Sequence, residues 1–222
     1  MGKPKDTMGD RLHVGGIVLC GGESSRMGLP KALLPFGPEL MLQRVVRVLS
    51  DVVEPVVVVA AVGQQLPKLP RDIIVARDER ECCGPLEGLR AGIGAIGKRA
   101  NAVYAASCDV PLLSVAFIRY MISQLGEYAA AVPYDGEFYH PFAAIYRTDT
   151  VGALERLLGE GKMRTSDLFE SVLTNRVPVR ELRSSDPELL SLLNVNTPRD
   201  YARALELAGI PINASLKTQL GL

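Results

Sequence analysis

The sequence has no tryptophan, only two histidines and no excess of either charge, because 25 Lys and Arg residues balance 25 Asp and Glu residues. A nucleic-acid-binding protein usually carries a basic excess that meets the phosphate backbone, so this balance disfavours a nucleic-acid partner. The first residues are polar and lack the apolar core of a signal peptide. The longest apolar runs are interrupted and too short to span a bilayer. We therefore expect no membrane partner and a cytoplasmic location.

Cysteine is also scarce, with four residues and no Cys-x-x-Cys pair. Because the chain has only two histidines as well, this pattern disfavours a zinc site of the Cys/His type. We interpret the adjacent Cys82 and Cys83 as reduced thiols, with a redox-active pair as the alternative. Cys20 and Cys108 end apolar runs, which predicts that they are small core residues.

A chain of 222 residues, 47% of them hydrophobic, is long enough for one sizeable core. The sequence contains no internal repeat, low-complexity block or domain linker. We expect a single domain over residues 14–208, preceded by a disordered tail at residues 1–13 and followed by a C-terminal tail at residues 209–222.

Apolar runs alternate with segments of helical periodicity along the chain. The predicted strands are residues 15–20, 56–61, 72–76, 102–108, 129–133 and 142–146, and the predicted helices are 40–49, 85–96, 114–125, 151–158 and 200–207. This alternation is typical of βαβ units, so we predict a Rossmann-like α/β fold with a mostly parallel sheet flanked by helices. The regularity weakens after residue 130, where we expect partly antiparallel strands that hold a second substrate.

Chemically suitable residues follow three of the predicted strands. Gly21 and Gly22 come directly after the first strand, Asp78 follows the third, and Asp109 follows the fourth. In open α/β sheets, ligands bind beyond the carboxyl ends of the strands. The sequence therefore predicts that these residues meet in one binding site at one edge of the sheet.

The segment LCGGESSRMGLPKALLPFG, residues 19–37, follows the first strand. It is not a Walker A motif, because Lys31 is followed by alanine, and it lacks the glycine spacing of a Rossmann fingerprint. Backbone N–H groups of Gly21 and Gly22 can form an anion-binding nest. Arg26 and Lys31 add fixed positive charge that suits phosphate. We predict a phosphate-binding loop.

This string resembles the signature of the nucleotidyltransferase superfamily that includes the molybdenum cofactor guanylyltransferases. The resemblance implies a fold of the nucleotide-diphospho-sugar transferase type and assigns nucleotide contacts or catalytic roles to Leu19, Cys20, Gly21, Gly22, Arg26 and Lys31. The double glycine is similar to the guanylyltransferase branch. Pro30, before the lysine, looks more like the sugar-nucleotide and isoprenoid-pathway transferases.

Asp109 lies in the sequence Ser-Cys-Asp-Val-Pro at the end of an apolar strand. A strand-end aspartate by itself is more often a cap, but beside a phosphate loop its carboxylate suits Mg²⁺, which would bridge phosphate oxygens. The same sequence resembles the metal motif of the family, which implies that Asp109 is the metal ligand and a catalytic residue.

Asp78 precedes the sequence GPLEGL, which resembles a family stretch in which the aspartate helps hold the nucleotide. The resemblance implies that Asp78 binds nucleotide and that Gly84 and Gly88 allow a close approach to the base or ribose. Without the resemblance, Asp78 reads as a surface charge among other charged residues.

Two motifs in the second half resemble the acceptor-binding residues of the family. His140 precedes Pro141, and the pair is interpreted either as shaping the acceptor pocket or as an ordinary turn. Asn194 and Asn196 alternate on a predicted strand and would point to the same face, where their amides can hydrogen-bond a pterin or a phosphate. Thr197 is expected to cap the helix that begins at Pro198.

The resemblance implies transfer of GMP from GTP to molybdenum-bearing molybdopterin, with Mg²⁺ as cofactor. It also implies transient contact with proteins that deliver or receive the molybdenum cofactor. The first alternative is a related nucleotidyltransferase that uses CTP or acts on a phosphorylated sugar or polyol. The second alternative is a non-catalytic nucleotide-binding regulator.

Overall fold

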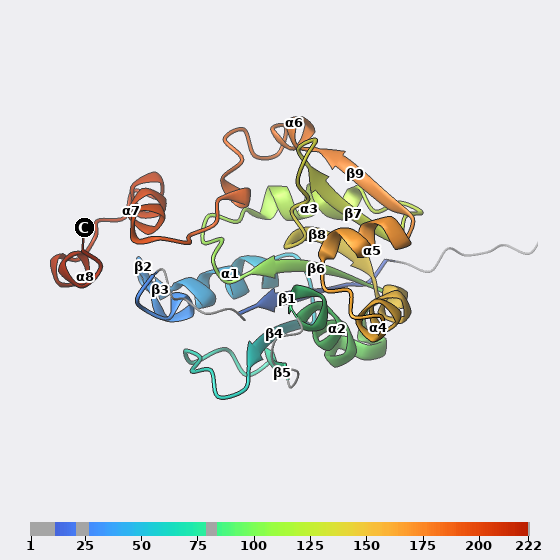
Figure 1. The fold of residues 1–222 in the computed structure, drawn as a ribbon. Helices are drawn as coiled ribbons and strands as arrows, with labels where there is room; N and C mark the ends of the chain where they lie inside the picture. The colour runs from blue at the N-terminus through green and yellow to red at the C-terminus, as the bar shows by residue number, and fades with distance from the viewer. Residues whose placement is uncertain (1–11, 21–26, 79–83, 222) are drawn as a thin grey trace, which may run out of the picture.

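Seven strands form one sheet in the order β5-β4-β1-β6-β8-β7-β9 (Figure 1) in the computed structural model, which describes residues 12–20, 27–78 and 84–221. The strands are β1 (Val14–Leu19), β4 (Val56–Ala61), β5 (Ile74–Asp78), β6 (Ala102–Ser107), β7 (Ala130–Tyr134), β8 (Ala143–Arg147) and β9 (Thr174–Pro178). A separate two-stranded hairpin consists of β2 (Pro35–Phe36) and β3 (Glu39–Leu40).

The first four strands of this order are parallel to one another, and β8 runs antiparallel between β6 and β7. The outer strand β9 is again parallel to β7. The short connection from β7 to β8 accounts for the reversal, because parallel neighbours need a long crossover. The predicted α/β class, the mostly parallel sheet and the partly antiparallel region after residue 130 are confirmed.

Helices cover both faces of the sheet (Figure 1). They are α1 (Met41–Ser50), α2 (Gly84–Ile96), α3 (Val115–Ser123), α4 (Val151–Gly159), α5 (Thr165–Ser171), α6 (Val179–Leu182), α7 (Pro198–Leu207) and α8 (Ala214–Gln219). Short 3-10 turns lie at Lys31–Leu33 (η1), Gly97–Arg99 (η2), Thr148–Thr150 (η3) and Leu190–Leu192 (η4). None of the helices in the described part of the chain combines the length and apolar character needed to cross a membrane.

Successive residues of β1 belong to different cores, because side chains alternate between the faces of a strand. Val18 packs with residues of α1 and α3, whereas Ile17 packs with residues of α2, α4 and α5. The contact between β1 and α2 is very close, since a Cβ added at Gly88 would lie 2.6 Å from Leu19 Cδ2. Gly88 is therefore needed for close helix–strand packing, a role that the sequence motif did not indicate.

A third cluster of buried side chains lies beyond the end of the sheet toward which β1 and β6 point (Figure 1). It joins Phe36 of the hairpin to Tyr201 and Leu205 of α7. Residues 209–221, which were expected to form a C-terminal tail, include α8. Leu220, directly after this helix, is buried in the cluster. This cluster fixes α7 and the segment before it next to the carboxyl ends of the parallel strands.

Most predicted elements agree with the structure to within two or three residues at each boundary. The sequence patterns did not predict α5, α6, α8, β2, β3 or β9, and they placed the strand that ends at Asp78 two residues too early. The strand β9 has the sequence TNRVP and lies at the sheet edge, where only one side is paired. Such an edge strand needs no apolar run, so its sequence gives little signal.

Candidate active site

Three predicted site residues meet at the carboxyl edge of the sheet. Lys31 Nζ lies 3.0 Å from Asp109 Oδ2 and donates a 2.7 Å hydrogen bond to Asn196 Oδ1. The ion pair is largely buried, with 17% of the Lys31 side chain and 15% of the Asp109 side chain exposed. A cation, a carboxylate and an amide from three distant parts of the sequence therefore form one polar centre.

The Asp109 carboxylate is held at the sheet edge by its neighbours. Cys108 N–H donates to Leu19 O at 3.0 Å, which ties the end of β6 to the end of β1. Val195 N–H donates to Asp109 O at 2.8 Å. Val110, which follows the aspartate, is buried in the core on the α1 side. These contacts fix the backbone on both sides of Asp109 and leave its carboxylate directed at Lys31.

Lys31 is the first residue of η1, and the two apolar residues that follow anchor this turn. Ala32 and Leu34 are buried in two different clusters, so the turn is held between the sheet and the α7 region. Leu34 N–H closes the turn on Lys31 O at 3.1 Å. The anchored backbone leaves the lysine side chain to reach across to Asp109.

The segment that carries Asn194 and Asn196 is not a strand, contrary to the prediction. It has no regular secondary structure and lies between η4 and α7, although Val195 is fully buried. Asn196 bonds to Lys31, whereas Asn194 is exposed. Burial of Val195 and its hydrogen bond to Asp109 O anchor this segment outside the sheet.

Asp200 holds the backbone beside Asn196 in place, a role that no sequence motif indicated. Its Oδ2 accepts hydrogen bonds from Asn196 N–H at 3.0 Å and Thr197 N–H at 2.8 Å. Thr197 Oγ1 in turn accepts from Asp200 N–H at 3.2 Å, which confirms the predicted cap of α7. Burial raises the pKa of Asp200, but these hydrogen bonds and the charge of Lys31 outweigh it, so the net pKa is lowered.

The end of β1 is bonded to both neighbouring strands. Leu19 and Cys20, predicted to contact the nucleotide, have buried side chains. Gln64, which the sequence analysis missed, donates to Cys20 O at 2.9 Å and accepts from Ala61 N–H at 3.1 Å. The position of a polar residue shortly after β4 was the feature of the sequence that could have indicated this role of Gln64. The predicted site residues Gly21, Gly22 and Arg26 lie outside the described residues, as do Cys82 and Cys83.

The two described cysteines are core residues, as predicted. Cys20 and Cys108 are both buried thiols at the ends of β1 and β6. A hydrogen bond with Cys108 and burial raise the pKa of the Cys20 thiol. Because the thiolate is the reactive form, this environment makes Cys20 a poor nucleophile.

Asp78 and His140 lie at the same edge of the sheet, at the end of β5 and in the connection between β7 and β8. Asp78 ends β5 and is paired in register with Ala61 of β4. His140 lies in the connection between β7 and β8, with its Nε2 4.0 Å from Asp135 Oδ2. Burial lowers the pKa of His140, and the charge of Asp135 opposes this only in part. The imidazole is therefore neutral at neutral pH.

The donor atoms of this centre suit a hard divalent cation that arrives with a ligand. The described residues contain no group of three or more His, Cys, Asp or Glu side chains that could hold a metal by themselves. Asp109 and Asn196 supply a carboxylate and an amide oxygen. Mg²⁺ is commonly bound by one or two carboxylates together with substrate phosphates and water. The residues therefore fit a cation shared with a nucleotide.

The fold places this polar centre at the carboxyl ends of the parallel strands, where open α/β sheets bind their ligands. The chain belongs to the MobA-like NTP transferase family, because the family described as the MobA-like NTP transferase domain matches residues 16–174. The resemblance proposed from the sequence is thereby confirmed.

Individual proteins agree with this membership. The chain is 39% identical over 207 residues to a probable molybdenum cofactor guanylyltransferase of Mycobacterium avium, covering 90% of this chain and 99% of the relative. It shares its fold with molybdopterin-guanine dinucleotide biosynthesis protein A from Archaeoglobus fulgidus, at TM-score 0.73 and 22% identity over 88% and 98% of the two chains. A Mycobacterium tuberculosis protein crystallised in complex with manganese has TM-score 0.58 and 20% identity, over 87% and 98%.

Proposed function

We propose that this protein transfers GMP from GTP to molybdenum-bearing molybdopterin, releasing pyrophosphate and forming the guanine dinucleotide cofactor. The observation that carries the proposal is the contact of Lys31 with both Asp109 and Asn196 at the carboxyl edge of the sheet. Family membership and the name of the Mycobacterium avium relative support the guanylyl group and the acceptor. The location proposed is the cytoplasm, where GTP is available.

In this proposal the terminal phosphate of the pterin attacks the α-phosphorus of GTP in line, and pyrophosphate leaves. The acceptor phosphate is already ionised near neutral pH, so no strong general base is required. Lys31 would exchange its contact with Asp109 for a phosphate oxygen of the nucleotide. Gly21, Gly22 and Arg26 are proposed from their sequence pattern to steady the triphosphate. Positioning and charge stabilisation supply the rate enhancement.

Asp109 would hold the divalent cation, which we propose to be Mg²⁺. Once bound, the cation supplies charge neutralisation on the phosphate oxygens. Asn196 would take over orientation of the Lys31 ammonium when Asp109 turns to the cation. His140 and Asn194 are proposed to line the acceptor pocket, and Asp78 is proposed to contact the nucleotide. Transient contact with proteins that deliver or receive the unstable cofactor is part of the proposal.

The test is pyrophosphate release with molybdenum-loaded molybdopterin and Mg²⁺, run in parallel with GTP, CTP, ATP and UTP. Release with GTP alone is the expected result. Release with CTP alone would move the protein to a cytidylyltransferase activity. If none of the four nucleotides gives pyrophosphate release in a preparation that still binds GTP, the proposed acceptor would be wrong. The protein would then be a nucleotide-binding regulator.

A further inference from the structure

The guanidinium of Arg44, on α1, contacts two separate segments of the chain, at Pro111 and at Phe36. Its Nε donates a 2.7 Å hydrogen bond to Pro111 O. Its Cζ lies 5.1 Å from the centre of the Phe36 ring, a cation–π distance. The side chain is 28% exposed, so much of its length is covered by these neighbours.

The two segments that Arg44 joins are those that carry the charged pair of the site. Pro111 follows Asp109 by two residues, and Phe36 follows Lys31 by five. Phe36 is fully buried in the cluster that includes α7, so the hairpin is a fixed support. One planar side chain therefore connects the backbone that positions Asp109 to the backbone that positions Lys31.

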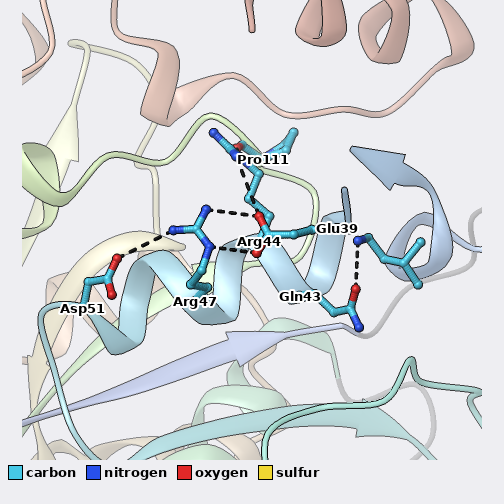
Figure 2. A network of polar contacts seen from close by, with 7 residues as sticks. Glu39, Gln43, Arg44, Arg47, Asp51 and Pro111 are labelled. Carbon is cyan, nitrogen blue, oxygen red and sulfur yellow. Dashed lines mark hydrogen bonds and ion pairs between the residues drawn. The ribbon is translucent and has the colours of Figure 1, made fainter. Parts of the chain in front are cut away.

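A second arginine on the same helix gives a matched comparison. Glu39 lies 3.8 Å from Arg44 Nη1 and accepts a 2.7 Å hydrogen bond from Arg47 Nε (Figure 2). Arg47 also lies 3.7 Å from Asp51 and is 49% exposed. Arg47 thus contacts Glu39 of β3 and Asp51 at the end of α1, whereas Arg44 also reaches the segment of Asp109.

We propose that Arg44 is a positioning residue for Asp109 in nucleotidyl transfer, acting through the carbonyl of Pro111. The inference rests on the proposed function. Loss of the Nε donor would leave the Pro111 carbonyl without this hydrogen bond and would loosen the turn that fixes the Asp109 carboxylate. Displacement of a reacting or binding group by about 1 Å can cost on the order of 100-fold in rate. Arg44 would affect cation binding and kcat without touching the substrate.

The experiment compares Arg44→Met, Arg44→Lys and Arg47→Met with the unchanged protein. Binding of Mn²⁺ is titrated in the presence of GTP and without acceptor, using the electron paramagnetic resonance signal of free Mn²⁺. Pyrophosphate release gives kcat and the KM for GTP, and thermal unfolding reports the fold. Arg44→Met is expected to weaken Mn²⁺ binding and lower kcat, each by about tenfold or more, with a smaller change in KM.

Arg44→Lys is expected to recover only part of both losses, because an ammonium cannot reproduce the planar guanidinium that meets Pro111 and Phe36 together. Arg47→Met is expected to change Mn²⁺ binding less than twofold, because the ion pairs of this exposed side chain with Glu39 and Asp51 do not reach the segment of Asp109. If Arg44→Met does not fold, the Lys variant decides the question.

Mn²⁺ binding of either folded Arg44 variant equal to that of the unchanged protein would overturn the proposal. An equal loss in Arg47→Met would also overturn it, since the effect would then come from α1 or Glu39. Failure of the proposed function has a different signature. In that case the unchanged protein would bind Mn²⁺ and GTP but release no pyrophosphate with molybdopterin, while the binding comparison would still test Arg44.

Discussion

Lys31 and Asp109 are 78 positions apart in the sequence, and their charged atoms lie 3.0 Å apart. The lysine ammonium neutralises the carboxylate that is proposed to hold the cation. A metal-bound triphosphate offers each partner a new ligand, a phosphate oxygen for Lys31 and a divalent cation for Asp109. We infer that nucleotide binding replaces this ion pair, and that the pair keeps both groups in place beforehand.

Asp109→Asn keeps the shape of the side chain and removes its charge. We expect kcat to fall by about 100-fold to 1,000-fold, the loss typical of one preorganised electrostatic group. The fold should be retained, because asparagine has the same size and keeps an oxygen that can accept a hydrogen bond from Lys31 Nζ. Pyrophosphate release and thermal unfolding measure the two effects. Turnover at the unchanged rate would remove Asp109 as the metal ligand.

Lys31→Met should weaken the use of GTP, because the variant loses the cation that faces the phosphates. The expected loss in kcat/KM for GTP is about 1.5–3 kcal/mol, the range for hydrogen bonds to charged groups. Lys98→Met is the matched control, since Lys98 is exposed in η2 at the opposite end of β6. Equal kinetics of the two variants would refute the phosphate-binding role of Lys31.

Asn196→Ala and Asn194→Ala should separate two roles that the sequence pattern does not distinguish. Asn196 bonds to Lys31, so its removal should lower kcat/KM for GTP by about tenfold, near the value of one charge-assisted hydrogen bond. Asn194 is exposed, so its removal should raise the KM for the acceptor and leave the KM for GTP unchanged. Identical kinetic profiles for both variants would contradict this division.

Asp200→Asn should destabilise the protein in a pH-dependent way. The pKa of Asp200 is lowered in the folded state, so its carboxylate stabilises the fold above the unfolded-state pKa of about 3.9. This contribution is lost as the pH falls through the lower folded-state pKa. Urea unfolding of both proteins should show a stability difference that is constant from about pH 5 to 7 and narrows below about pH 4. A stability difference between the two proteins that stays constant below about pH 4 would show that the Asp200 carboxylate is not its source.

His140→Gln tests whether the histidine acts by shape or by proton transfer. Burial lowers the pKa of His140 below its ordinary value of about 6.5, so the imidazole is already neutral above that pH. We expect the variant to raise the KM for the acceptor and to keep the pH dependence of kcat above about pH 6.5. Loss of a titrating step in that range would instead indicate a general base.

Local patterns predicted much of the fold. Apolar runs such as that of β4 and the spaced apolar residues of α1 and α2 are periodic enough to identify strands and helices. The edge strand β9 has no such pattern and was missed. Pairing of β8 between β6 and β7 depends on how the short connection from β7 folds, which periodicity does not encode.

The sequence by itself determined which residue types are available for the chemistry and that Asp78 and Asp109 end strands at one edge. It also determined the cap of α7 through Thr197 and Asp200, because capping depends on residues close together in the chain. Only the tertiary structure decided that Asn196, and not Asn194, bonds to Lys31, since this hydrogen bond joins residues 165 positions apart in the chain. The contact of Arg44 with Pro111 likewise arises from packing between elements far apart in the chain.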